Sequence, residues 1–252
     1  MRTSEFHPWY VAPEEAVAIQ RRLAAQVVRQ GSPGPVRRVA GADISVDRDG
    51  HGRGAVVVLS YPELEPLEVQ TAEAAVPFPY VPGLLAFREV PVLLPAFERL
   101  QEVPDLLLVD GQGIAHQRRF GIACHLGLIL DVPAIGCAKS RLVGSHDPVG
   151  DEEGSWAPLA DKGESVGVAL RTRRGAGPIY VSIGHRIGLE EARGWALRLC
   201  RGYRLPEPCR LAHQAAGGTW RLSYPTRPGQ GSHAVGWPSP RASAPSPQLT
   251  LF

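Results

Sequence analysis

The residues best suited to chemistry stand together in LLLVDGQGIAHQRR, residues 106–119. The apolar start of this segment predicts a buried strand, and Asp110 follows that strand directly. Ligands usually bind at the carboxyl ends of strands in an open α/β sheet, so the Asp110 carboxylate is well placed to hold a cation. His116, Arg118 and Arg119 come soon after and suit a phosphate-bearing substrate. The alternative is a strand-to-helix turn in which Asp110 only caps a helix.

Two other acids stand where a strand or helix gains nothing from a charge. Asp43 lies within the apolar segment VAGADISV, and Glu89 ends the segment GLLAFRE. A carboxylate near the centre of a sheet is costly unless it binds a cation. Acids from three separate segments suit Mg²⁺, or Mn²⁺ as a substitute, and His213 is a candidate further ligand. Taken singly, each residue has an ordinary explanation, such as an ion pair with Arg88, but together they favour a metal site.

The composition sets these residues in a nearly neutral chain. The 252 residues carry a formal charge of +2, and 25 of the 27 basic residues are arginine, which leaves only Lys139 and Lys162 as lysines. Lysine offers a compact charge with a usable proton, so Lys139 is a candidate functional residue. The four cysteines lack zinc-binding spacing and indicate reduced thiols. With no membrane-spanning run and no signal peptide in the sequence, we expect a cytoplasmic protein.

The elements that must position these residues alternate between helix and strand. We predict helices over residues 13–30, from Pro91 to about 101, and over 119–130, 189–201 and 207–216. We predict strands over residues 36–46, 54–60, 67–76, 105–110, 133–138, 164–172 and 178–183. A short helix is expected before Pro91, and residues 144–163 are expected to form an acidic surface loop. Three meandering strands followed by alternating helices and strands predict one α/β domain over residues 1–224, a mixed sheet flanked by helices.

Longer motifs connect the acids with a known family. GADISV, PYVPGLLAFRE, VDGQGIAHQRRFGIACHLG and IGCAKSRL occur in this order, followed by KGESVGVALRTR, YVSIGH and RLPEPCRLAHQAA. Over roughly residues 8–218 the chain resembles endonuclease V, a deoxyinosine-directed DNA repair nuclease with a ribonuclease H-like fold. The resemblance implies a Mg²⁺-dependent enzyme, expected to act as a monomer. It would hydrolyse the second phosphodiester bond 3′ to deoxyinosine in DNA and leave a 3′-hydroxyl and a 5′-phosphate.

The resemblance also implies roles for individual residues. The metal would be held by Asp43, Glu89, Asp110 and His213, and the scissile phosphate would lie near Lys139 and His116. Glycine-rich turns would let the backbone approach the flipped base closely. The residues expected around the substrate are Gly83, Leu85, Arg88, Gly111, Gly113, Arg118, Gly121, Ile122, Gly136, Ala138 and Ser182. Departures from the family pattern at Gln117, Ala134 and Ile183 affect none of the expected metal ligands.

The PYVPG segment matches the wedge of the family. Tyr80 lies between Pro79 and Pro82, whose rings stiffen the backbone. An aromatic side chain in such a loop could fill the gap left when a damaged base rotates out of the stack. The alternative is a tyrosine packed in an ordinary proline-rich loop.

The sequence changes character from Pro225. Residues 225–247 are rich in proline, glycine, serine and alanine and contain no acid, which predicts a disordered tether. The final QLTLF, residues 248–252, resembles the short peptide with which many bacterial repair and replication proteins bind the sliding clamp. The expected contact residues are Gln248, Leu249, Leu251 and Phe252. A random hydrophobic terminus, or one that folds back on the domain, is the alternative.

Two other functions stay open at this point. One is cleavage of inosine in RNA, because no feature of the sequence settles contact with a 2′-hydroxyl group. The other is a module that binds lesions without cutting. The clustered acids argue against the second, since a pure binding protein gains nothing from carboxylates beside a phosphate.

Overall fold

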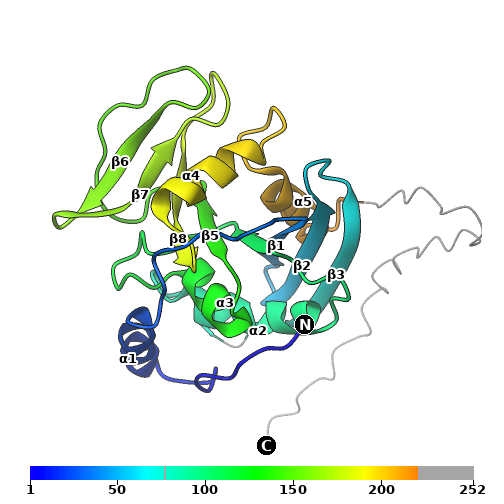
Figure 1. Ribbon diagram of the computed structural model, residues 1–252. Helices are drawn as coiled ribbons and strands as arrows, with labels where there is room; N and C mark the ends of the chain where they lie inside the picture. Colours follow the sequence, from blue (N-terminus) through cyan, green and yellow to red (C-terminus); the bar gives the residue numbers. More distant parts are fainter. Residues whose placement is uncertain (77, 221–252) are drawn as a thin grey trace, which may run out of the picture. The chain divides into compact units, whose positions relative to one another are not determined.

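A mixed sheet of eight strands forms the centre of the computed structural model, which describes residues 1–76 and 78–220. The strands are β1 (Arg38–Val46), β2 (His51–Ser60), β3 (Pro66–Ala75), β4 (Leu106–Val109), β5 (Ala134–Ala138), β6 (Trp156–Asp161), β7 (Glu164–Leu170) and β8 (Ile179–His185). Their order is β3-β2-β1-β4-β5-β8-β7-β6 (Figure 1). The central strands β1, β4 and β5 are parallel, and the outer pairs are antiparallel.

Helices cover both faces of this sheet. They are α1 (Pro13–Ala24), α2 (Leu85–Glu98), α3 (Ile122–Leu130), α4 (Leu189–Arg198) and α5 (Glu207–Ala216). Helix α2 packs on β2 and β3, α3 on β5 and β8, α4 on β8, and α5 on β1 and β2 (Figure 1). The predicted mixed α/β sheet flanked by helices is therefore confirmed.

Alternation along the central strands divides the core into two apolar clusters. In β4, Leu106 and Leu108 belong to one cluster, and Leu107 and Val109 belong to the other. This is the two-residue period of a strand whose faces are both covered. The residue that follows β4, Asp110, therefore takes the side of Leu106 and Leu108.

Helix α5 lies unusually close to β1 because of a glycine. A Cβ atom at Gly41 would lie 1.9 Å from the carbonyl oxygen of Pro208, which no side chain can do. Asp43 is two residues further along β1 and so points to the same face. The glycine thereby allows the face of α5 to reach the Asp43 carboxylate.

The prediction of two helices on either side of residue 91 is wrong, because α2 continues through Pro91 and Pro95. Each proline removes one helical hydrogen bond. Both prolines are only partly buried, whereas Phe87 and Leu93 are fully buried in the core. Packing of the apolar face outweighs the two missing bonds.

The prediction of a surface loop over all of residues 144–163 is also wrong, because its last part forms β6. Ala157 and Leu159 alternate inward along this strand. The acidic composition of the segment predicted a loop, but β6 is at the edge of the sheet, where the missing N–H group of Pro158 is tolerated.

Helix α1 ends at Ala24, six residues before its predicted end. The chain then runs beside the end of β8, where the N–H of Val28 donates to His185 Nδ1 at 3.3 Å and the Val28 carbonyl accepts from Arg186. Long-range bonds thus replace the last predicted helical turn.

The expected domain limit at residue 224, the tether 225–247 and the QLTLF ending lie outside the described residues. In the part that the structure describes, no helix combines the length and apolar character that a membrane crossing requires.

Candidate active site

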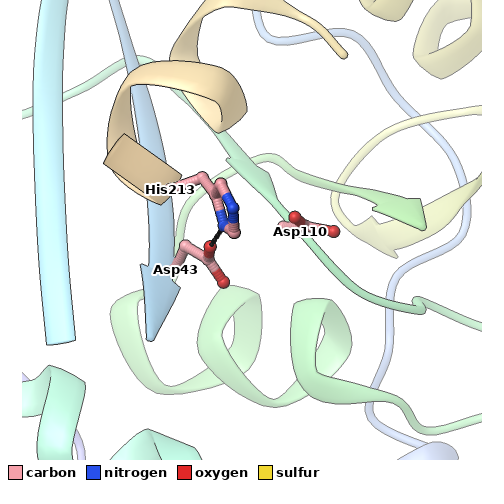
Figure 2. A group of neighbouring side chains, drawn as sticks. All are labelled: Asp43, Asp110 and His213. Carbon is pink, nitrogen blue, oxygen red and sulfur yellow. Dashed lines mark hydrogen bonds and ion pairs between the residues drawn. The ribbon is translucent and has the colours of Figure 1, made fainter. Parts of the chain in front are cut away.

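Asp43, Asp110 and His213 meet at one edge of the central strands (Figure 2). Each offers a ligand atom, and these atoms all lie within 4.8 Å of one another. Strands β1 and β4 are parallel neighbours in which Ala42 is paired with Val109, so both aspartates follow paired residues and share a face. The Nδ1 atom of His213, on α5, donates to Asp43 Oδ2 at 2.6 Å.

Burial makes the negative charges of this site costly. The side chains of Asp43 and Asp110 are only 12% and 9% exposed. Burial raises the pKa of Asp43, and the charge of Asp110 raises it further, while the hydrogen bond from His213 acts in the opposite direction. A buried carboxylate whose pKa is raised by a neighbouring acid is a setting in which a cation is stabilising.

Glu89 approaches the same site from α2. Its pKa is raised to about 8, mainly by burial and then by the charge of Asp43, with a smaller contribution from Asp110, and Arg88 opposes this shift. Glu89 is not in the group whose ligand atoms lie within 4.8 Å. The structure thus brings three expected ligands together and sets the fourth close enough for their charges to act on it. We call Asp43, Glu89 and Asp110 the acid cluster.

Lys139 balances part of this charge. Its Nζ atom lies 2.6 Å from Asp110 Oδ2, in an ion pair that is not aligned as a hydrogen bond. The backbone carbonyl of Lys139 accepts from Arg204 at 2.6 Å, and that of Ser140 accepts from Gln112 at 2.8 Å. The lysine is therefore fixed at its main chain while its ammonium group reaches the acid cluster.

Mg²⁺ or Mn²⁺ fits the residues present. The donors are carboxylate oxygens and one imidazole, which hard divalent cations accept, and there is no thiolate among them. The buried Asp110 Oδ2 lacks a hydrogen-bond donor in the described residues, although Lys139 is in ionic contact with it. A cation would supply the missing partner.

The glycine-rich turn after β4 is packed against neighbouring strands. A Cβ atom at Gly136 would lie 2.4 Å from the nitrogen of Gly113, and one at Gly113 would lie 2.0 Å from the carbonyl oxygen of Ile183. The N–H of Gly113 donates to the buried Ser182 Oγ at 2.9 Å. These glycines therefore let the turn pack against β5 and β8. This packing requires glycine independently of any contact with the flipped base. Of the other expected substrate residues, Gly111 and Gly121 lie in the same turn, Leu85 and Ile122 begin α2 and α3, and Ala138 ends β5.

The loop that carries Tyr80 is exposed at its tip and held at both ends. Tyr80 is 72% exposed, and Pro79 and Pro82 beside it are exposed as well. Before the tip, the carbonyl of the buried Phe78 accepts from Arg88 Nη1 at 3.0 Å. After the tip, the carbonyl of Gly83 is bonded to several side chains, one of which is His116.

The His116 ring is occupied by bonds within the protein. Its Nδ1 atom accepts from the backbone N–H of Arg118 at 3.2 Å, which leaves Nε2 to donate to the Gly83 carbonyl at 2.9 Å. Burial, and then the charge of Arg118, lowers the pKa of His116 to about 4. The ring is therefore neutral near pH 7, and a direct phosphate contact would require one of these bonds to break.

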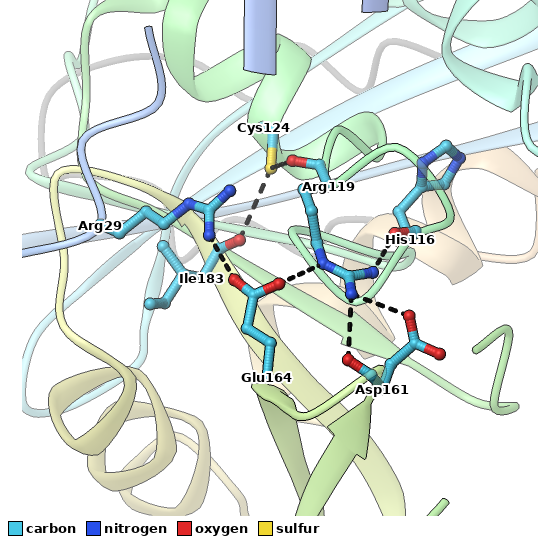
Figure 3. A network of polar contacts seen from close by, with 7 residues as sticks. All are labelled: Arg29, His116, Arg119, Cys124, Asp161, Glu164 and Ile183. Atoms are coloured by element: carbon cyan, nitrogen blue, oxygen red, sulfur yellow. Dashed lines mark hydrogen bonds and ion pairs between the residues drawn. The ribbon is translucent and has the colours of Figure 1, made fainter. Parts of the chain in front are cut away.

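The two arginines after His116 also have partners within the chain. Arg118 donates to Gly83 at 2.7 Å and to Gln20 at 2.5 Å. Arg119 donates to Glu164 at 2.6 Å and pairs with Asp161 at 2.8 Å (Figure 3). In this structure both guanidinium groups bind protein oxygens.

Gln20 is a residue that sequence reasoning missed. It is 1% exposed and lies on the buried stripe of α1 with Ala16, Ile19 and Leu23. The signal was a polar side chain at a position where the helical period expects an apolar one. A buried amide must find hydrogen-bond partners, and these partners connect α1 with the Tyr80 loop.

Comparison with known proteins confirms the resemblance. The family model described as Endonuclease V matches residues 21–214. The Endonuclease V of Dehalococcoides mccartyi is 53% identical over 217 residues, which are 86% of this chain and 97% of the relative. The crystal structure of Endonuclease V from Streptomyces avermitilis has a TM-score of 0.80 at 40% identity and covers 86% of this chain and 97% of its own. Endonuclease V from Ciona intestinalis, in complex with a 23mer DNA containing an inosine followed by a ribo-adenosine, has a TM-score of 0.73 at 28% identity, with 82% and 98% covered.

Proposed function

Because the chain belongs to the endonuclease V family, we propose that it is a Mg²⁺-dependent nuclease that cuts DNA beside deoxyinosine. It would hydrolyse the second phosphodiester bond on the 3′ side of the lesion and leave a 3′-hydroxyl and a 5′-phosphate. The observation that carries this proposal is the meeting of Asp43, Asp110 and His213 beside Glu89. The inosine in the DNA bound by the Ciona relative supports the substrate.

The acid cluster and His213 would hold the cation. A divalent cation supplies Lewis acidity that activates water at neutral pH and neutralises charge on the departing oxygen. Asp43 would contribute an oxygen ligand from within β1, Asp110 would contribute one from the end of β4, and Glu89 would contribute one from α2. His213, whose side chain is 59% exposed, would act from the solvent side. Mn²⁺ would substitute for Mg²⁺ at such a site.

Lys139 would act beside the scissile phosphate. Its ammonium group is 2.6 Å from Asp110, so a phosphate close to the cluster lies within its reach. A positive charge there stabilises the negative charge that develops on the phosphoryl oxygens. His116 would act through the Gly83 carbonyl to which it donates, as a residue that positions the loop.

Tyr80 would fill the space left by the flipped base. The tyrosine is exposed on a loop that is fixed at both ends, which is the arrangement that an inserted side chain requires. The turn that contains Gly111, Gly113 and Gly121 would lie against the extruded base. Ser182 would support this turn by accepting from the N–H of Gly113, and Arg118 would support the loop by donating to the carbonyl of Gly83.

A second substrate, inosine in RNA, has one observation in its favour. The DNA bound by the Ciona relative carries a ribo-adenosine after the inosine. That relative therefore binds a strand with a ribonucleotide after the inosine, and RNA is the alternative substrate to test here.

The test is nicking of a duplex oligonucleotide that contains one deoxyinosine, with Mg²⁺ or with EDTA, by the wild type and by Asp110→Ala. We expect a Mg²⁺-dependent cut one nucleotide beyond the lesion, which Asp110→Ala abolishes while it still binds the oligonucleotide. Asp151→Ala, at an aspartate whose side chain is 88% exposed, is the matched control. Tight binding by the wild type without cutting would support a lesion-binding module. Cutting of inosine RNA alone would make the RNA the substrate.

We further propose that the QLTLF ending binds the bacterial sliding clamp. Two apolar anchors at the end of a polar tail suit a preformed groove. The 23 residues of the tether would reach on the order of 70 Å at about 3.1 Å per residue. The clamp would then keep a cytoplasmic, monomeric nuclease on newly copied DNA.

Deletion of residues 248–252 tests this partner. We expect the truncated protein to be lost from a pull-down with the clamp and to nick free oligonucleotides at the wild-type rate. Replacing Gln248, Leu249, Leu251 and Phe252 with alanine at full length is the companion variant. Unchanged binding to the clamp would disprove the proposal.

A further inference from the structure

We propose that Gln20 is a positioning residue that sets the place of the Tyr80 loop, so that its loss weakens recognition of the lesion. The inference rests on the proposed role of Tyr80 as the wedge. Gln20 lies in α1, far along the chain from the loop, from the acid cluster and from every expected substrate residue.

All the polar atoms of the Gln20 side chain are used within the protein. The amide nitrogen donates to the carbonyl of Gly83 at 3.0 Å and to that of Phe120 at 3.1 Å. The amide oxygen accepts from Arg118 Nε at 2.5 Å. One buried side chain therefore joins three segments: α1, the end of the Tyr80 loop, and the turn that follows β4.

The Gly83 carbonyl receives three donors. They are Gln20 Nε2 at 3.0 Å, Arg118 Nη2 at 2.7 Å and His116 Nε2 at 2.9 Å. We call these three side chains and the Gly83 carbonyl the Gly83 anchor. A carbonyl oxygen has two lone pairs, so three donors more than fill its capacity to accept hydrogen bonds. Donors from two different parts of the chain fix the oxygen in space.

The turn that supplies two of these donors, His116 and Arg118, is itself held by further hydrogen bonds (Figure 3). Arg119 Nη1 donates to the carbonyl of His116 at 2.8 Å, and Arg119 Nε donates to Glu164 at 2.6 Å. Arg29 donates to the other oxygen of Glu164 at 2.6 Å. The Gly83 anchor therefore rests on a rigid support, and among the described donors to the Gly83 carbonyl only Gln20 comes from outside the turn.

An inserted side chain needs this kind of support. The tip of the loop is exposed, so Tyr80 gains little placement from packing on its own protein. Its position is set by the ends of the loop, at Phe78 through Arg88 and at Gly83 through the anchor. A shift of about 1 Å in a positioning group is enough to reduce catalysis substantially.

Gln20→Leu tests the proposal, because leucine has a similar volume and makes no hydrogen bond. We expect the preference for inosine DNA over the same duplex with adenine, measured as the ratio of kcat/KM values, to fall about tenfold. We expect this loss to arise mostly from a higher KM for inosine DNA, and we expect the affinity for Mg²⁺ to stay unchanged. Gln26→Leu, the same change at an exposed glutamine just after α1, is the matched control and should behave as the wild type.

A double-variant cycle separates positioning from general damage. If Gln20 acts through the wedge, Gln20→Leu should cost little in a Tyr80→Ala background, because the side chain that it positions is already gone. Equal losses in both backgrounds, or wild-type preference in Gln20→Leu, would overturn the inference. If Gln20→Leu does not fold, Gln20→Asn, which keeps the amide and shortens its reach, enters the same cycle with the same criteria. Failure of the wild type to cut inosine DNA would instead contradict the proposed function.

Discussion

The acid cluster and the Gly83 anchor are both buried and polar, yet they differ in how far the protein satisfies them. In the anchor, Gln20 and His116 have a partner for every polar side-chain atom. In the cluster, like charges face one another, and Asp110 Oδ2 has ionic contact without an aligned hydrogen bond. The anchor is complete as the chain folds, whereas the proposed cation would complete the cluster.

This difference separates two ways in which a protein uses buried polar groups. A satisfied network makes one arrangement rigid, which suits a loop that must present an aromatic side chain. In the cluster, burial and the charges of neighbouring acids raise the pKa values of Asp43 and Glu89. A positive charge would stabilise their ionised forms, which suits a cation site. The first region should therefore govern recognition and stability, and the second should govern catalysis.

Asp43→Asn should give the largest effect and the sharpest contrast. The carboxylate charge is lost from the shared ligand group, so nicking should fall by at least about 1,000-fold, as for residues that act as a catalytic unit. The fold should not be harmed, because repulsion from Asp110 is relieved. Nicking rates with Mg²⁺ and thermal unfolding with EDTA measure both effects. A large loss of stability with activity retained would contradict the assignment.

The two regions should also respond to pH in opposite directions. The folded pKa of Glu89, about 8, lies above the unfolded value of 4.5, so its contribution to stability is lost as pH rises through this window. The folded pKa of His116, about 4, lies below the unfolded value of 6.5, so its contribution is present above pH 6.5 and lost as pH falls toward 4. Each group changes stability by at most about 1.4 kcal/mol per pH unit.

Urea unfolding with EDTA at pH 5, 6.5 and 8 measures this contrast. Relative to the wild type, Glu89→Gln should gain stability as pH rises from 5 to 8. His116→Asn should be most destabilised at pH 6.5 and above, and the difference should shrink at pH 5. Parallel profiles for the two variants would show that the contrast is wrong.

Gly83→Ala should give the smallest effect and should act on the anchor alone. Gly83 has a φ of +80°, and an added Cβ would lie 2.8 Å from the side chains of Arg118 and Gln117. We expect a loss of about 1 to 2 kcal/mol in the free energy of unfolding. The preference for inosine should fall while Mg²⁺ affinity stays constant. Altered Mg²⁺ affinity would mean that the two regions are not separable.

Particular residues show how far the sequence could be interpreted. Asp110 could be placed at a strand end because the four apolar residues before it, LLLV, predict a buried strand. The alternation of side chains along β4 then determines the face on which Asp110 lies. Pro91 misled the prediction, because the local cost of a proline is real but is outweighed by the packing of α2. The acidic composition of residues 144–163 hid the strand β6, which lies at the edge of the sheet. Gln20 gave only a weak signal, since its partners are 63 to 100 residues away.

The sequence by itself determined the fold class, the family and the identity of the candidate ligands, because these follow from local periodicity and from motifs with distinctive residues. Only the tertiary structure decided which polar groups are satisfied. The close contact at Gly41 lets His213 bond to Asp43. His116 and Arg118 donate hydrogen bonds to the Gly83 carbonyl, and Arg119 donates one to Glu164. Hydrogen bonds and charge interactions depend on ångström distances between segments far apart in the chain, and no local pattern of residues encodes those distances.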